Sequence, residues 1–139
     1  RRITMIAITR DPIDPYKFIE SAKKPETGGI VTFIGTVRDD GIEALDLDVC
    51  EEVALSDLNT IAKQATADYH LNTVDIVHRV GRMELTETIL VIVVGVSHRQ
   101  EGFAACSWIL EQIKAFVPIW KKDICKNGES WHFSKEEGS

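Results

Sequence analysis

Two lysines, Lys114 and Lys121, stand seven residues apart on either side of Pro118. Seven residues are close to two helical turns, and a proline must end a helix, so both side chains can leave the helix end in similar directions. The apolar residues between them can hold both stems in the core while both ammonium groups face a common space. Ser97-His98-Arg99 stands just before the same helix and adds further cations. This pattern predicts a pocket for an anion.

Each of these side chains also has a simpler interpretation. A lysine near the C-terminus of a helix is ordinarily there because cations suit the negative end of the helix dipole. Arg38 follows a strand and could simply pair with Asp39 or Asp40 at the surface. His98 and Arg99 are harder to explain in this way, because cations are disfavoured at a helix start. Residues placed against a local preference point to function.

Composition favours a single compact domain. The chain has 139 residues, of which 44% are hydrophobic, and we expect one domain over residues 1–133 with a frayed polar tail over 134–139. A net charge of −6 argues against nucleic acid as the main partner. Three widely spaced cysteines indicate a reducing compartment, and the longest apolar run, residues 89–96, is too short to span a bilayer. We therefore expect a cytoplasmic protein, and the four scattered histidines suggest no metal site.

Hydrophobic periodicity predicts an α+β fold. The long helices should bury apolar residues that include Val53, Phe103 and Phe116, and one side chain of His78-Arg79 should point outward from its strand. A turn is expected around Gly81, and Asn-Gly at 127–128 predicts a final hairpin. The expected strands are 3–9, 30–37, 45–49, 74–80, 89–97, 120–125 and 130–133, and the expected helices are 15–22, 51–69 and 100–116.

Several short motifs, taken together in their order along the chain, are informative. They are GIVTFIGTVRD at 29–39, VHRVG at 77–81, H-R-x-x-x-F at 98–103 and L-x-x-x-K-x-x-x-P-x-W-K at 110–121. None is specific alone. The ordered set, which extends over roughly residues 3–133, resembles the large, catalytic subunit of molybdopterin synthase.

The resemblance implies a fold, a reaction and partners. The fold would be of the α/β hammerhead type with an additional antiparallel β-sheet. The enzyme would be a sulfurtransferase that converts cyclic pyranopterin monophosphate into the dithiolene molybdopterin, with no metal or organic cofactor. The sulfur would come from a thiocarboxylate at the C-terminal Gly-Gly of a ubiquitin-like small subunit. Two large subunits would form a central homodimer, with one small subunit at each end of a heterotetramer.

The resemblance also implies roles for individual residues. Lys114 matches the lysine beside the small subunit's C-terminal glycine and would be the central catalytic residue. Lys121 matches a second essential lysine, which would stabilise charge on the substrate or the tail. The residues that would bind substrate or shape its pocket are Arg38, His98, Arg99, Phe33 and Trp120.

The sequence departs from the family pattern at Cys50, where an aromatic residue is expected, at Thr86, which replaces a turn glycine, and at Asp123, which replaces a glutamate.

Two other functions remain open. One is a non-catalytic module that binds a ubiquitin-like partner, which the intact Lys114 and Lys121 disfavour. The other is a small anion-binding regulatory domain, which is disfavoured because no glycine-rich phosphate-binding motif is present.

Overall fold

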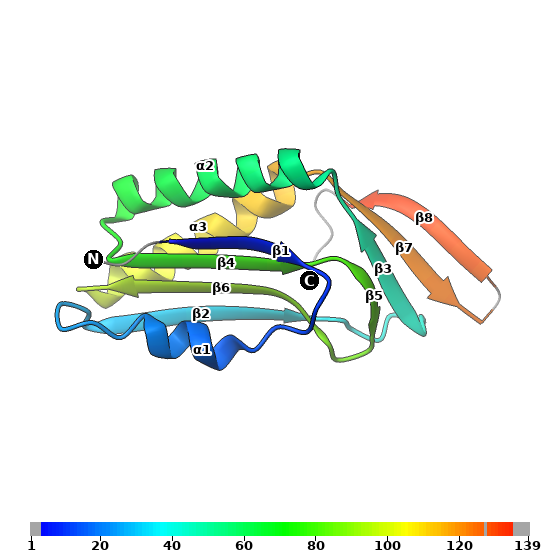
Figure 1. Cartoon of the computed structure of the whole chain (residues 1–139), viewed down its shortest axis with the longest axis horizontal. Helices are drawn as coiled ribbons and strands as arrows, with labels where there is room; N and C mark the ends of the chain where they lie inside the picture. Colours follow the sequence, from blue (N-terminus) through cyan, green and yellow to red (C-terminus); the bar gives the residue numbers. More distant parts are fainter. Residues whose placement is uncertain (1–3, 127, 135–139) are drawn as a thin grey trace.

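The computed structural model describes residues 4–126 and 128–134, and within them the chain forms three helices and eight strands. The strands pair mainly antiparallel and the helices pack on them (Figure 1), as expected for an α+β fold. In chain order they are β1 (Met5–Thr9), α1 (Pro15–Ser21), β2 (Gly29–Thr36), β3 (Ala44–Asp48), α2 (Glu51–Tyr69), β4 (Thr73–Arg79), β5 (Gly81–Glu84), β6 (Thr88–Val96), α3 (Arg99–Phe116), β7 (Ile119–Cys125) and β8 (Gly128–Ser134).

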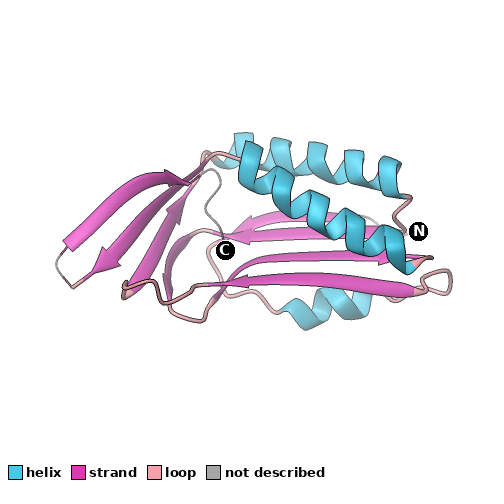
Figure 2. Ribbon diagram, turned by 180° about the vertical axis from the view of Figure 1, so that it is seen from behind, coloured by secondary structure: helices cyan, strands magenta, loops and turns pink. Residues whose placement is uncertain are grey.

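The main sheet has the strand order β1-β4-β6-β2 and carries helices on both faces. Strand β1 runs parallel to β4, whereas β4 with β6 and β6 with β2 are antiparallel. The long helices α2 and α3 cover one face, and the short helix α1 lies on the other (Figure 2). The core under α2 and α3 contains alternate residues of β4 and β6, such as Ile76 and Ile92, both fully buried. Because its two faces are covered, β4 is buried along its whole length.

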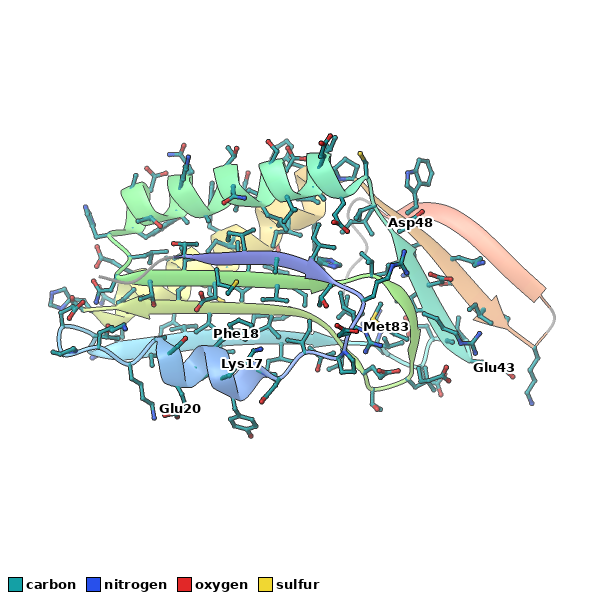
Figure 3. The ribbon with its side chains drawn as sticks, in the orientation of Figure 1. Lys17, Phe18, Glu20, Glu43, Asp48 and Met83 are labelled. Atoms are coloured by element: carbon teal, nitrogen blue, oxygen red, sulfur yellow. The ribbon has the colours of Figure 1, made fainter. Side chains whose placement is uncertain are left out.

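The second sheet is entirely antiparallel, in the order β5-β3-β7-β8, and lies at one end of the main sheet (Figure 1). This is the additional antiparallel sheet that the resemblance implied. Its own small core forms around Met83, which is fully buried on β5, where the two sheets meet (Figure 3). Strand β5 was not predicted from the sequence. It is only four residues long, and the turn expected around Gly81 is instead the point where the chain passes from β4 into β5.

Local chemistry accounts for the helix ends. Helix α1 begins at Pro15, and the Asp14 carboxylate accepts a hydrogen bond from the backbone N–H of Tyr16 at 3.1 Å. Helix α2 ends at Tyr69, because His70 adopts the left-handed conformation with φ 56°. Helix α3 ends at Phe116, two residues before Pro118, as the proline predicted. These ends determine where the chain turns toward the second sheet.

Three helical side chains do not point inward as predicted. Phe103 and Phe116 on α3 are 64% and 65% exposed, and Val53 on α2 is 46% exposed. A helix buries only the stripe that faces its sheet, and that stripe on α3 runs through residues such as Ile109 and Ile113 instead. The final hairpin is confirmed and β8 extends to Ser134, which was expected in the frayed tail, while Asn127 and residues 135–139 lie outside the described residues.

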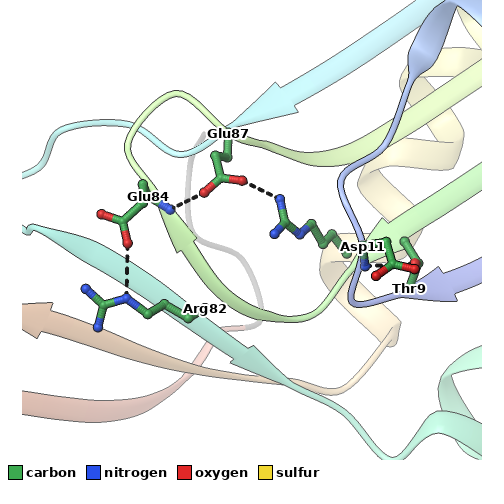
Figure 4. Close-up of polar contacts among 6 residues, drawn as sticks. Thr9, Asp11, Arg82, Glu84 and Glu87 are labelled. Carbon is green, nitrogen blue, oxygen red and sulfur yellow. Dashed lines mark hydrogen bonds and ion pairs between the residues drawn. The ribbon is translucent and has the colours of Figure 1, made fainter.

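His78 and Arg79 are both buried, so the expectation that one of them points outward is wrong. Both faces of β4 are covered, so neither alternate position reaches solvent. The Arg79 guanidinium pairs with the Glu87 carboxylate, which also accepts the backbone N–H of Glu84 at 2.7 Å (Figure 4). The Glu84 N–H and Arg79 together lower the pKa of Glu87. This network holds the turn between β5 and β6, where Thr86 has φ 75°.

Candidate functional site

A pocket of about 430 Å³ lies where the main sheet, the second sheet and the C-terminal end of α3 meet. Its walls are mostly apolar, and three cationic side chains are among the residues that line it. The lining residues come from four regions: Phe33, Ile34, Gly35, Thr36, His78, Ile89 and Leu90 of the main sheet; Leu45, Leu47, Ile119 and Lys121 of the second sheet; Leu110, Ile113 and Lys114 of α3; and Val37, Arg38, Asp40 and Ile42 after β2.

Both predicted catalytic lysines line this pocket, so the expectation that they face a common space is confirmed. Lys114 lies in the last turn of α3 and Lys121 in β7. The chain leaves α3 at Val117, whose backbone N–H still bonds to the carbonyl of Ile113 at 3.1 Å, and Pro118 then leads directly into β7. The two lysines therefore approach the pocket from a helix and a strand, rather than from two turns of one helix.

Trp120 does not line the pocket, contrary to the prediction that it helps to shape it. Successive side chains of a strand point to opposite faces. Because Ile119 and Lys121 on β7 both line the pocket, Trp120 between them points away from it, and it is 51% exposed. Phe33 does line the pocket, as predicted.

Arg38 pairs with a neighbouring aspartate and also lines the pocket. Its Nε donates to the Asp40 carboxylate at 3.0 Å in an exposed ion pair, as the simpler interpretation predicted. It also lines the pocket together with Asp40, in the loop that follows β2. An exposed pair of this kind contributes little to stability. Its position at the pocket is therefore the more informative observation.

His98 and Arg99 do not join the lysines within one chain, so the single cationic cluster predicted from the sequence is wrong for a lone protomer. They line a separate hollow at the start of α3, with Gly28, Ser97 and Gln100. Helix α3 has 18 residues, which at 1.5 Å per residue is a length of about 27 Å. The start and the end of the same straight helix cannot meet in one pocket. Their role in substrate binding stays a prediction.

His78 was not expected at the pocket from the sequence, yet it lines the pocket from β4. Its Nδ1 lies 2.9 Å from the backbone carbonyl oxygen of Arg79. Burial lowers the pKa of His78, and the hydrogen bond to that carbonyl opposes the shift only in part. The ring is therefore neutral near pH 7. Alternation with the buried Val74 and Ile76 was the one sign that His78 faces α3 rather than solvent.

The pocket suits an anionic ligand that also has an apolar or planar part. Lys114, Lys121 and Arg38 can each donate hydrogen bonds to a phosphate or carboxylate-like group. The apolar walls lower the local dielectric and strengthen such contacts. Within the described part of the chain, no three His, Cys, Asp or Glu side chains gather as a metal site, and no helix is long and apolar enough to cross a membrane.

Comparisons with known proteins agree with this architecture. A molybdopterin synthase catalytic subunit from Thermoplasma volcanium is 39% identical over 134 residues, covering 93% of this chain and 98% of that protein. A molybdopterin biosynthesis MoaE protein from Burkholderia ambifaria superposes with a TM-score of 0.86 at 30% identity, covering 99% of this chain and 94% of the other.

A third similarity concerns the fold alone. A complex of subunits 1 and 2 of molybdopterin-converting factor from Helicobacter pylori contains a chain that matches with a TM-score of 0.79 at 21% identity, covering 91% of this chain and 88% of that one.

The family model described as MoaE protein matches residues 8–116, more than half of the sequence. Because that model covers most of the sequence and the Thermoplasma volcanium protein is 39% identical, this chain belongs to the MoaE protein family.

Proposed function

We propose that this chain is the catalytic large subunit of a molybdopterin synthase and acts as a sulfurtransferase. It would transfer sulfur from the C-terminal thiocarboxylate of a small, ubiquitin-like subunit to cyclic pyranopterin monophosphate, and so form the dithiolene of molybdopterin. The observation that carries this proposal is the joint presence of Lys114, Lys121 and Arg38 around one largely apolar pocket.

The chemistry of the two reactants fits these side chains. The pterin carries a phosphate and the sulfur donor is an anionic thiocarboxylate, so the site must neutralise several negative charges at once. Lys114 would polarise the thiocarboxylate carbonyl or move a proton during sulfur transfer. Lys121 would stabilise charge on the tail or the substrate, and Arg38 would hold the substrate at the pocket. Phe33 would form part of the apolar wall.

The proposed partner is a small subunit whose extended Gly-Gly tail enters the pocket. The Helicobacter pylori structure is a protein–protein complex of subunits 1 and 2 of molybdopterin-converting factor, and we extend a two-subunit assembly to this chain as part of the proposal. The large subunits would form a homodimer within a heterotetramer. The cytoplasmic location expected from the sequence stays a prediction.

A homodimer would determine whether His98 and Arg99 can reach the substrate. Because these residues lie at the far end of α3 from Lys114, they can act on substrate at the lysine pocket only if a second copy of the chain presents them there. Mixed dimers test this role. If Lys114→Ala and Arg99→Ala chains are each inactive, mixing them should restore up to about a quarter to a half of wild-type turnover; no recovery on mixing would remove the role across the dimer.

The function itself is tested by reconstitution. The purified chain is mixed with a small subunit that bears a C-terminal thiocarboxylate and with cyclic pyranopterin monophosphate, and the dithiolene product is detected by mass spectrometry. The matched control uses the same small subunit with an ordinary carboxylate, which has no sulfur to give. Product in the first mixture alone supports the proposal. Tight binding of the small subunit without product would instead support the non-catalytic binding module.

A further inference from the structure

His78 differs chemically from the other polar groups around the pocket. It stands on β4 opposite Leu90 of β6, and both side chains line the pocket from the main sheet. Lys114, Lys121 and Arg38 can only donate hydrogen bonds. Asp40 can accept them, but it is engaged by Arg38. A neutral histidine inside the pocket can offer a ligand something that the cations cannot.

The hydrogen bond at Nδ1 determines which ring nitrogen offers a lone pair. A carbonyl oxygen can only accept, so Nδ1, at 2.9 Å from the Arg79 oxygen, must carry the proton. In the neutral ring the other nitrogen, Nε2, is then an acceptor. Nε2 makes no hydrogen bond to another described residue. It is not completely buried, although the side chain as a whole is only 6% exposed. Because the side chain lines the pocket and the Arg79 carbonyl occupies Nδ1, Nε2 is the ring nitrogen left for a ligand there.

The surroundings keep the ring in this form. Burial disfavours the imidazolium, which would cost solvation that the pocket does not return. The pocket thus combines cationic donors with a neutral ring nitrogen that can accept a hydrogen bond on its sheet wall.

We propose that Nε2 of His78 accepts a hydrogen bond from an N–H group of the pterin ring system and thereby helps to select and orient the substrate. This inference rests on the proposed function. A pterin offers a flat, nitrogen-rich ring with several N–H donors, and its phosphate is an anion. The cations would hold the anionic part, while His78 would recognise the ring against the apolar wall that includes Phe33, Leu110 and Ile113.

Two substitutions separate the ligand contact from the structural hydrogen bond. In His78→Asn the amide N–H can replace Nδ1 and still donate to the Arg79 carbonyl, but nothing replaces Nε2. In His78→Gln the longer side chain can place its amide oxygen near the Nε2 position, while the Nδ1 donor is lost. We expect His78→Asn to weaken binding of cyclic pyranopterin monophosphate about three- to tenfold, and His78→Gln by less than about twofold.

Binding is measured by calorimetric titration of the complete large subunit with cyclic pyranopterin monophosphate. His70→Asn is the matched control, because His70 is exposed and pairs with Glu101 at 2.9 Å. Histidine ¹⁵N NMR provides a second measurement: the His78 ring should show a protonated Nδ1, and its Nε2 resonance should shift when the pterin binds. The affinity for a carboxylate form of the small subunit should be unchanged in both variants, since the tail is not the proposed donor.

The outcomes distinguish this inference from the function on which it rests. If the wild-type chain binds and converts the pterin but His78→Asn binds it equally well, the inference alone is wrong. The same conclusion follows if Asn and Gln weaken pterin binding equally, or if only small-subunit binding suffers. If the wild-type chain neither binds nor converts the pterin, the proposed function fails and the role of His78 fails with it.

Discussion

Replacing Lys114 by alanine should separate catalysis from stability. Lys114 is half-buried in the last turn of α3, where a cation gains about 0.3–1 kcal/mol from the helix dipole. Alanine returns a few tenths of a kcal/mol, roughly, because it is the better helix former. The free energy of unfolding should therefore fall by less than about 1 kcal/mol.

The expected effect on turnover is much larger. A positioned acid or base contributes about 10²- to 10⁴-fold to a rate. At 1.36 kcal/mol per factor of ten, that corresponds to about 3–5 kcal/mol of activation free energy. Lys114→Ala should thus lose about 10²- to 10⁴-fold in sulfur transfer while it keeps its fold and its affinity for the small subunit.

The assay is single-turnover dithiolene formation with thiocarboxylated small subunit in excess, alongside chemical denaturation of each variant. Lys114→Arg keeps the positive charge but cannot release its proton, so residual activity in this variant would indicate a purely electrostatic role. Lys63→Ala, on the exposed face of α2, is the matched control for removal of a helical lysine. Turnover of Lys114→Ala within about threefold of the wild type would refute the catalytic assignment.

Three further predictions concern residues around or outside the pocket. Thr86→Gly should raise the free energy of unfolding by about 0.5–1 kcal/mol. The backbone strain of φ 75° in a β-branched residue costs more than the extra chain entropy that glycine loses on folding. Urea denaturation checks this, and an unchanged midpoint would contradict it. Arg38→Ala should raise KM for the pterin about tenfold, with little change in stability, because its ion pair with a neighbouring aspartate is exposed; steady-state kinetics would disprove the assignment if KM stayed the same. Replacing Cys50, Cys106 and Cys125 together by serine or alanine should leave single-turnover sulfur transfer within about twofold of the wild type. Burial raises the pKa of Cys106 to about 11 and so suppresses its thiolate. A folded but inactive triple variant would show that cysteine carries the sulfur.

Periodicity in the sequence was sufficient for most of the fold. The helices predicted over 51–69 and 100–116 correspond to α2 and α3, because apolar residues at helical spacing have few other stable arrangements in water. The final hairpin was equally predictable from the Asn-Gly turn. Strand β5 was missed, because its four residues gain their stability from pairing with β3 and from the burial of Met83, not from any local preference.

For the site, the sequence by itself determined which residue types are available and which of them lie close along the chain. Lys114 and Lys121 meet in one pocket because a single proline-ended turn joins their helix and strand, and such a local connection can be inferred from spacing. Only the tertiary structure decided the contacts between distant segments. It separated His98 and Arg99 from the lysines by the length of α3, turned Trp120 away through the alternation of β7, and brought His78 into the pocket from β4. These outcomes depend on how the two sheets and α3 pack together, and that packing cannot be inferred from residue spacing along the chain.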